Sequence, residues 1–288
     1  MRHTRWPLVR SAASGVLLAA LVIAIGVSVS RQVDLLDRHF IFFPTKGLTE
    51  TPEAQGLQYE DVYFTATDGT RLNGWFVPGE SDITWLWFHG NGGNLSGQVD
   101  ELAATHRHLD VNIFVVDYRG YGNSEGKPSE KGLYLDADAA VEYLRSRGDV
   151  DMNRVVVFGR SLGSAVAVET ARRHEVYALV LESPFTSIKE MAKLSYAFIP
   201  GWLFVKSRFD SLSKMAELRV PLLVLHDGGD ELVPFDMGQE IFESATGHKR
   251  FALLENGAHN SAHLDSDTEY FKAIKDFLEG LPGQPSGQ

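Results

Sequence analysis

The sequence predicts an α/β domain in which a mostly parallel sheet is covered by helices on both faces. From about residue 57, short apolar and β-branched runs alternate with longer segments of helical periodicity. Four consecutive apolar residues, as in Val155–Phe158, are typical of a strand buried on both faces. Glycine-rich and polar loops follow these runs. Because ligands bind outside the carboxyl ends of strands in such sheets, the functional residues are sought there.

The composition predicts one large globular domain with an appendage. The chain has 288 residues, of which 44% are hydrophobic and 23% charged. It holds 27 Lys and Arg against 38 Asp and Glu, a formal net charge of −11, and no basic stripe is interleaved with aromatic residues. Nucleic acid is therefore not expected as a partner. The chain has no cysteine, which excludes disulfides, thiolate zinc sites and a cysteine nucleophile. We expect no metal and no cofactor.

Residues 11–30 are uncharged and mostly apolar, and they predict a transmembrane signal anchor. A helix of that length spans about 30 Å, the thickness of the bilayer hydrocarbon. Three arginines precede it within residues 1–10, whereas the two that follow are offset by aspartates. This places residues 1–10 in the cytoplasm and the remaining chain on the non-cytoplasmic side. A cleaved signal peptide is the alternative, but no clear Ala-x-Ala site follows the run.

The first part of the remaining chain predicts a connector and a hairpin. Residues 31–56 are expected to join the anchor to the domain at 57–280. Within them, Phe40 to Pro44 is too short to cross a membrane, and we expect it to pack on the domain or lie at the membrane interface. Asp68-Gly69 separates strand-like runs at 60–67 and 71–77, which is a strong hairpin signal.

A third strand, residues 83–88, ends in the glycine-rich loop His89 to Asn94. Such a loop lets backbone N–H groups approach a ligand. A phosphate cradle is the alternative, but the Lys-Ser/Thr pair of a P-loop is missing.

Helices and strands then alternate to the end of the domain. Helical spacing predicts helices at 98–108, 133–144, from 162, after Pro234 and at 270–278. Apolar runs predict strands at 111–118, 155–158, 177–181, 222–226 and 251–254. Residues 184–220 are too long for a simple crossover, and residues 281–288 are expected to form a flexible tail.

The pattern Gly-x-Ser-x-Gly at residues 159–163 lies between a predicted strand and a predicted helix, which makes it a nucleophile elbow with Ser161 at the apex. The serine of such an elbow has a strained backbone, so its neighbours must be small, and Gly159 and Gly163 meet that need. The same pattern surrounds Ser124, but Lys127-Pro128 follows where a helix would have to begin. Ser124 is therefore expected to be a loop residue.

A serine nucleophile needs a base, and the base needs an orienting acid. Asp230 follows the strand 222–226 and His259 follows the strand 251–254. The order Ser161, Asp230, His259 is the order of serine, acid and histidine in hydrolases built on such a sheet.

Each member of this predicted triad has an alternative. Asp227 or Glu182 is an alternative acid, since each also ends a predicted strand. His263 lies one helical turn beyond His259, whereas His248 lies at the wrong end of its strand.

Five motifs together resemble the α/β-hydrolase family, and specifically its membrane-anchored members of the serine-aminopeptidase-like branch, over about residues 40–278. They are His89-Gly90-Asn91, residues 117–122, 159–163, 229–234 and 257–260. The resemblance implies an oxyanion hole made by the backbone N–H groups of Asn91 and Leu162. It also implies that residues 184–220 form a short cap insertion over the site.

The expected function is hydrolysis of a small-molecule or lipid acyl ester or thioester through an acyl-enzyme. The residues expected to bind the substrate are His89, Tyr121, Phe185 and Trp202. The apolar residues of the cap either pack it onto the domain or line an acyl channel and touch the bilayer. The alternatives are an aminopeptidase or amidase, an acyltransferase, and an anchored binding protein without turnover.

Overall fold

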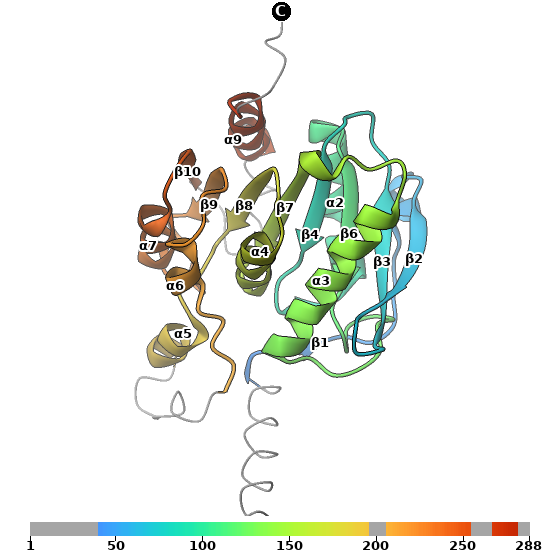
Figure 1. Cartoon of the computed structure of the whole chain (residues 1–288), viewed down its shortest axis with the longest axis horizontal. Coiled ribbons are helices and arrows are strands. Elements are labelled where there is room, and N and C mark those ends of the chain that lie inside the picture. Colours follow the sequence, from blue (N-terminus) through green and yellow to red (C-terminus); the bar gives the residue numbers. More distant parts are fainter. Residues whose placement is uncertain (1–39, 196–205, 255–266, 282–288) are drawn as a thin grey trace, which may run out of the picture.

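The computed structural model describes residues 40–195, 206–254 and 267–281 (Figure 1). The predicted anchor at 11–30, Trp202 and His259 lie outside these ranges. Within them, no helix is both long and apolar enough to cross a membrane. The anchor therefore stays a prediction.

An eight-stranded sheet forms the centre of the domain, in the order β10-β9-β8-β7-β4-β6-β3-β2. Its strands are β2 (Glu60–Thr65), β3 (Arg71–Val77), β4 (Thr84–Phe88), β6 (Asn112–Asp117), β7 (Val155–Arg160), β8 (Ala178–Glu182), β9 (Leu222–Asp227) and β10 (Lys249–Leu254). The pairs β2–β3 and β3–β6 are antiparallel and the others are parallel. The predicted mostly parallel sheet is confirmed, as is the hairpin turn at Asp68-Gly69, where Gly69 has a φ of 86°.

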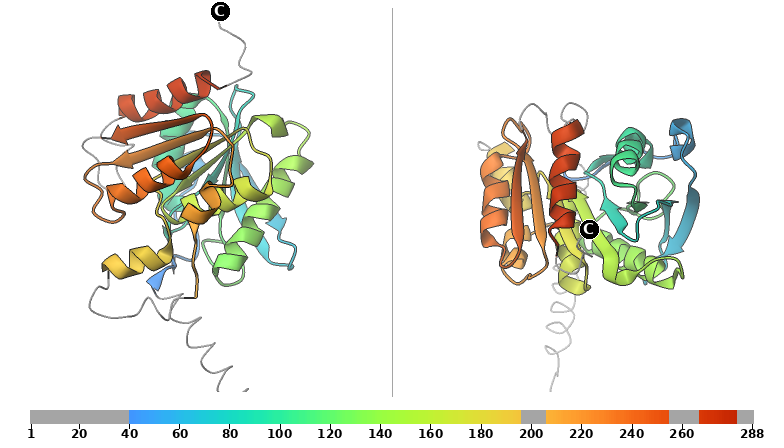
Figure 2. Two further views of the ribbon diagram at one scale, coloured as in Figure 1. Left: turned by 60° about the vertical axis from the view of Figure 1, so that its left-hand side comes forward. Right: turned by 90° about the horizontal axis from the view of Figure 1, so that it is seen from above.

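Helices cover both faces of the sheet (Figures 1 and 2). They are α2 (Val99–Leu109), α3 (Glu130–Ser146), α4 (Leu162–Arg173), α5 (Ile188–Ser195), α6 (Ser211–Met215), α7 (Phe235–Ser244) and α9 (Asp267–Glu279). Residues of α2 and α9 belong to the core on one face, and residues of α3, α4, α6 and α7 to the core on the other.

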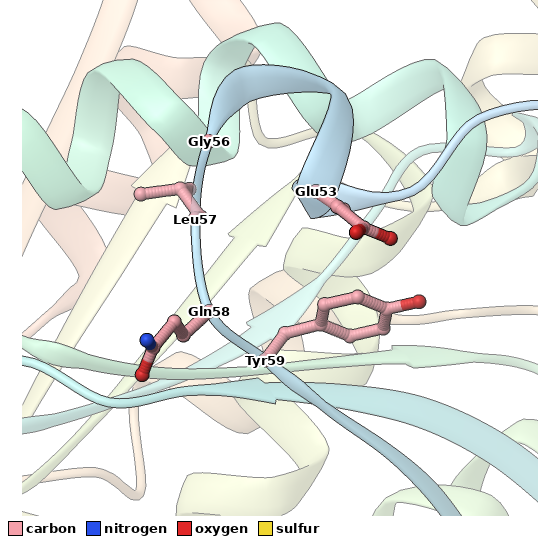
Figure 3. Close-up of a pocket in the computed structure, with 5 residues that line it drawn as sticks. All are labelled: Glu53, Gly56, Leu57, Gln58 and Tyr59. Atoms are coloured by element: carbon pink, nitrogen blue, oxygen red, sulfur yellow. The ribbon is translucent and has the colours of Figure 1, made fainter.

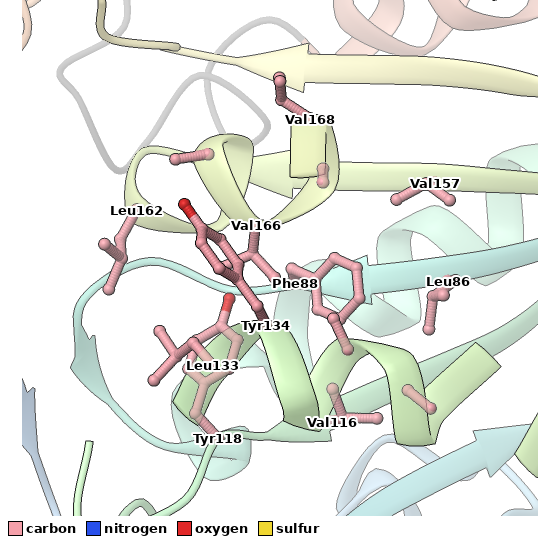
Figure 4. Packing of buried hydrophobic residues seen from close by; sticks show 14 of the residues in the cluster. Leu86, Phe88, Val116, Tyr118, Leu133, Tyr134, Val157, Leu162, Val166 and Val168 are labelled. Carbon is pink, nitrogen blue, oxygen red and sulfur yellow. The ribbon is translucent and has the colours of Figure 1, made fainter. Parts of the chain in front are cut away.

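The alternation of side chains along a strand divides the core into these two layers. On β4, Leu86 and Phe88 join the layer under α3 and α4, whereas Trp85 and Trp87 join the layer under α2 and α9. Figure 4 shows Phe88 packed close to Val166 of α4. Both faces of the central strands are therefore apolar, as their uninterrupted apolar runs predict.

The strand order brings two loops together. The parallel neighbours of β4 are β6 on one side and β7 on the other, so the chain changes direction across the sheet at this point. Ligands bind at such a switch point, outside the carboxyl ends of the strands. The loop after β4 and the turn after β7 carry the predicted oxyanion donors and the predicted nucleophile.

The residues before the hairpin are part of the folded domain. Ile41 and Phe42 are buried, and Phe43–Pro44 forms a short strand, β1, parallel to Gly92–Gly93 (β5). A 3₁₀ helix, η1 (Pro52–Gln55), follows. Packing on the domain, one of the two alternatives for this stretch, is confirmed for Ile41 and Phe42. The folded unit thus includes residues 40–56, which precede the expected boundary at 57.

The segment between β8 and β9 contains α5 and α6, and its described part packs on the domain. Phe185 and Phe209 are buried, while Ile188 and Met191 are partly buried against the same core. Leu194 is exposed. The remaining apolar residues that suggested an acyl channel, Trp202 among them, lie at positions 196–205, outside the described residues.

Candidate active site

Ser161 stands at a strained turn between β7 and α4. Its φ of 50° and ψ of −115° are unusual for any residue other than glycine, and such a conformation costs on the order of 1–3 kcal/mol. A Cβ atom on Gly159 would lie 2.2 Å from the carbonyl oxygen of Gly163, and one on Gly163 would lie 2.0 Å from that of Phe88. The expectation of small neighbours around Ser161 is confirmed.

The turn places Ser161 at the N-cap of α4. The Ser161 amide donates to the carbonyl of Glu182 at 2.9 Å, and the Ser164 hydroxyl donates to the Ser161 carbonyl at 2.6 Å. Ser161 is 8% exposed, and within the described residues its Oγ has no hydrogen-bond partner. Leu162 is the first residue of α4, and the first N–H groups of a helix lack intrahelical acceptors. Its amide therefore has no intrahelical acceptor, which an oxyanion donor requires, and its oxyanion role stays a prediction.

The glycine-rich loop after β4 lies directly against this elbow. A Cβ on Gly163 would also come within 2.7 Å of the His89 carbonyl oxygen, so the two backbones are in contact. The predicted oxyanion donors thus follow two neighbouring strands: the Asn91 amide lies in the loop after β4, and the Leu162 amide lies at the start of α4 after β7.

The peptide that carries the Asn91 amide is held from one side by an imidazole. His89 Nδ1 lies 2.7 Å from the Gly90 carbonyl oxygen. Because a carbonyl can only accept, Nδ1 carries the hydrogen in this contact. The Gly90 carbonyl and the Asn91 N–H belong to one planar peptide. The hydrogen bond therefore fixes the direction of the Asn91 N–H, which has no acceptor within the described residues.

His89 and Tyr121 are both fully buried beneath this loop. The Tyr121 hydroxyl donates to the Asn91 carbonyl at 2.8 Å, and the Tyr118 hydroxyl donates to the His89 carbonyl at 2.7 Å. Burial raises the pKa of Tyr121, so its hydroxyl stays protonated and able to donate. Both residues were expected to contact the substrate, but in this geometry they support the loop backbone. Phe185, a third expected contact, is buried in the core.

Asp117 completes the support of the loop. His89 Nε2 lies 3.4 Å from Asp117 Oδ1, and both side chains are fully buried. The Leu95 amide donates to the same carboxyl oxygen at 3.1 Å. Burial raises the pKa of Asp117, although the His89 contact opposes this effect. Sequence reasoning missed this role; the available signal was a carboxylate at the end of β6, the strand beside β4.

The predicted acid, Asp230, lies in the turn after β9. Its Oδ1 accepts hydrogen bonds from the Leu232 and Val233 amides, both at 2.9 Å, and its side chain is fully buried. The alternative acid, Asp227, is the last residue of β9, and its Oδ1 accepts from the Gly229 amide at 2.7 Å. Both carboxyl groups therefore belong to one turn. The predicted base, His259, and its alternative, His263, lie outside the described residues.

A buried ionic cluster lies beside the elbow, and sequence reasoning missed it as well. Arg160, the residue before the nucleophile, pairs with Glu101 of α2 and with Glu182, to which its Nε lies 2.9 Å away. The Tyr270 hydroxyl donates to Glu182 at 2.8 Å. Burial lowers the pKa of Arg160, but the two carboxylates outweigh it and raise that pKa well above its ordinary value. The Glu182 carboxylate is thus already paired with Arg160 and hydrogen-bonded to Tyr270, which argues against Glu182 as the acid of the triad.

Ser124 lies in a turn after β6 and is buried. Its hydroxyl donates to the Asp117 carbonyl at 2.7 Å and accepts from the Asn73 amide at 2.8 Å. The expectation that Ser124 is a loop residue is confirmed, and both hydrogen bonds of its hydroxyl are structural.

A depression of about 510 Å³ lies beside η1 (Figure 3). It is lined by Glu53, Gly56, Leu57, Gln58 and Tyr59 and contains neither a nucleophile nor a histidine. Across the described parts of the chain, no group of three or more His, Cys, Asp or Glu side chains is arranged to hold a metal ion.

Comparisons with known proteins agree with this arrangement. Residues 80–215 match the family described as serine aminopeptidase, S33. An uncharacterized protein of Mycobacterium tuberculosis, Rv2307c, is 34% identical over 91% of this chain and 94% of its own length. The α/β-hydrolase domain-containing protein WAV2 of Arabidopsis thaliana is 34% identical over 82% of this chain and 83% of its own.

A solved structure shares the fold. The Pyrococcus furiosus esterase Pf2001 superposes with a TM-score of 0.70 at 23% identity, covering 84% of this chain and 99% of that one. With the sheet order, the strained serine turn and these relatives taken together, the chain belongs to the α/β-hydrolase family, and its residues 80–215 are similar to the serine aminopeptidase members of that family.

Proposed function

We propose that this protein is a membrane-anchored serine hydrolase that cleaves an acyl ester or thioester. The observation that carries the proposal is the Ser161 turn. The turn keeps a strained backbone and two glycines that no larger residue could replace, next to a loop that offers a fixed amide. Such strain persists only where the surrounding structure enforces it, and it is concentrated at functional sites.

In the proposed reaction, Ser161 Oγ attacks the acyl carbonyl carbon and its proton passes to His259. Asp230 orients that imidazole and stabilises its charged form. The carbonyl electron pair moves to the oxygen, which accepts hydrogen bonds from the Leu162 and Asn91 amides. Each such donor is typically worth about 10²–10³ in rate. The alcohol or thiol leaves with the proton from His259, and water then releases the acid from the acyl-enzyme.

A fluorophosphonate probe tests the nucleophile, because it reacts only with an activated serine. Ser161→Ala is expected to abolish both labelling and ester hydrolysis, since loss of a nucleophile costs several orders of magnitude in rate. Ser124→Ala is the matched control, since it removes the other serine in a Gly-x-Ser-x-Gly pattern and should leave labelling intact. Labelling that survives in Ser161→Ala and disappears in Ser124→Ala would refute the assignment.

The histidine is tested in the same way. His259→Ala should be as damaging as loss of Ser161, whereas His263→Ala should keep most of the activity. The rate should rise with pH through the histidine titration, because only neutral imidazole can take the serine proton. An inactive His263 variant beside an active His259 variant would reverse the assignment.

The location is part of the proposal: residues 11–30 anchor the chain, with the domain on the non-cytoplasmic side. Full-length protein is expected to stay with membranes during carbonate extraction. A chain that begins at Arg31 should be released and still hydrolyse a soluble ester. Release of the full-length chain by carbonate would instead favour signal cleavage or peripheral attachment.

The bond that is cleaved is tested with a panel of acyl esters, acyl thioesters and aminoacyl amides. Faster turnover of the amides would make the protein an aminopeptidase, and product formed on added alcohols would make it an acyltransferase. Absence of both labelling and turnover would leave an anchored binding protein.

A further inference from the structure

The segment at residues 41–47, which we call the strap, lies along the glycine-rich loop as an added strand. Its β1 residues pair in parallel with Gly92–Gly93 of the loop. The Phe43 amide donates to the Asn91 carbonyl at 2.9 Å, and the Thr45 amide donates to the Gly93 carbonyl at 2.9 Å. The strap therefore adds backbone partners to a loop that is otherwise held by side chains, among them the hydroxyls of Tyr118 and Tyr121.

Two asparagine side chains of the loop bind the strap in return. Asn91 Nδ2 donates to the Ile41 carbonyl at 3.1 Å. Asn94 Nδ2 donates to the Gly47 carbonyl at 2.6 Å and to the Thr45 carbonyl at 3.2 Å. Asn94 is buried, so these contacts are shielded from water.

The strap is itself fixed at several points. Ile41 and Phe42 are buried, and the Phe42 ring meets Phe209 edge-on at 6.2 Å. Lys46 Nζ donates to the Ser124 carbonyl at 2.7 Å. The Gly122 amide donates to the Thr45 carbonyl at 2.9 Å. The strap thus bridges the loop after β4, the loop after β6 and, through Phe209, the cap segment between β8 and β9.

These contacts converge on the residue whose amide is the proposed oxyanion donor. The carbonyl of Asn91 is held by the Phe43 amide and the Tyr121 hydroxyl, and its side chain by the Ile41 carbonyl. Gly92 and Gly93 follow it, and glycine has more backbone freedom to lose than any other residue. External partners are therefore needed to hold the loop in one conformation.

We infer that the strap is a positioning element of the oxyanion hole. It holds Asn91 so that the amide of this residue points at the developing oxyanion. This inference rests on the proposed serine hydrolase function. An oxyanion donor that is displaced by about 1 Å loses much of its effect, on the order of 100-fold in rate.

Phe43→Pro tests the inference, with Phe43→Ala as its matched control. Phe43 is 52% exposed, so either variant loses little packing. Only proline also removes the N–H that donates to the Asn91 carbonyl. We expect kcat/KM of Phe43→Pro to fall roughly 10- to 100-fold, mostly in kcat, and that of Phe43→Ala to stay within about twofold of wild type.

A trifluoromethyl ketone distinguishes positioning from simple loss of structure. Ser161 adds to its carbonyl carbon, and the resulting oxyanion needs the same amides. In Phe43→Pro the inhibition constant should rise by the same factor as kcat/KM falls, while the affinity for the carboxylic acid product stays unchanged. Val62→Ala, a core truncation on the edge strand β2, should lower the melting temperature without changing the inhibition constant.

Asn94→Asp provides a second variant should Phe43→Pro not fold. A carboxylate keeps the acceptor that caps the Ser96 amide but loses both hydrogen bonds to the strap. It should reduce kcat and inhibitor affinity in parallel. If Ser161→Ala is inactive while Phe43→Pro and Asn94→Asp keep wild-type kcat and inhibition, the strap inference is refuted and the proposed function stands. If Ser161→Ala stays active, the proposed function itself fails.

Discussion

Replacing Gly163 with alanine should damage the active site while leaving the fold intact. The new Cβ would lie 2.0 Å from the Phe88 carbonyl oxygen. Ordinary contact begins near 3.4 Å, so the elbow and the end of β4 would have to separate by about 1.4 Å. The contacting atoms are backbone atoms of two elements, and no flexible side chain can yield instead. Overpacking of this kind costs about 1–3 kcal/mol.

The separation moves the nucleophile away from the oxyanion loop, since Gly163 is the point where the two touch. Misplacement by about 1 Å costs on the order of 100-fold in rate, so kcat/KM should fall at least that far. The melting temperature should drop by roughly 2–12 °C. Ester hydrolysis and calorimetry measure the two effects. Gly148→Ala is the control, because its Cβ would meet nothing within 4 Å. Equal kcat/KM in the two variants would refute this account of the elbow.

Three further predictions concern the carboxylate of the triad, the stability of the fold at low pH and the choice of substrate. Asp230→Asn should lower kcat severely and Asp227→Asn only slightly, and the opposite result in an ester assay would transfer the acid role to Asp227. Burial alone would raise the pKa of Glu169, but its hydrogen bonds to neighbouring cations lower it to about 2, below the ordinary value of 4.5. The ionised Glu169 carboxylate therefore stabilises the folded state fully above about pH 4.5, and this contribution is lost as the pH falls from 4.5 to 2. In urea unfolding at these pH values, the free energy of unfolding of Glu169→Gln should fall less on acidification than that of wild type. Trp202 and Phe204 are two of the apolar cap residues at positions 196–205. If they line an acyl channel, medium or long acyl esters should be preferred by about 0.8 kcal/mol per CH₂, and serine at both positions should blunt that preference without affecting acetyl esters. A flat chain-length profile in the wild type would refute the channel.

The order along the chain of the eight strands of the central sheet, the positions of α2, α3, α4, α7 and α9, and the position of the elbow followed from the sequence alone. All three depend on local patterns: uninterrupted apolar runs for strands buried on both faces, a 3.6-residue period for helices, and Asp-Gly for the hairpin turn. The elbow could also be chosen over its duplicate, because Lys127-Pro128 prevents a helix after Ser124, whereas a helix follows Ser161. Local sequence is sufficient where the constraint is itself local.

Only the tertiary structure decided what supports the site. His89 and Tyr121 were expected to face a substrate, yet both are buried and hold the loop backbone. The strap was expected to be a connector, and its partners lie about 50 residues away along the chain. A buried polar group must find a partner, but which partner depends on which strand ends become neighbours. That adjacency is set by the sheet order, and no local pattern in the sequence encodes it.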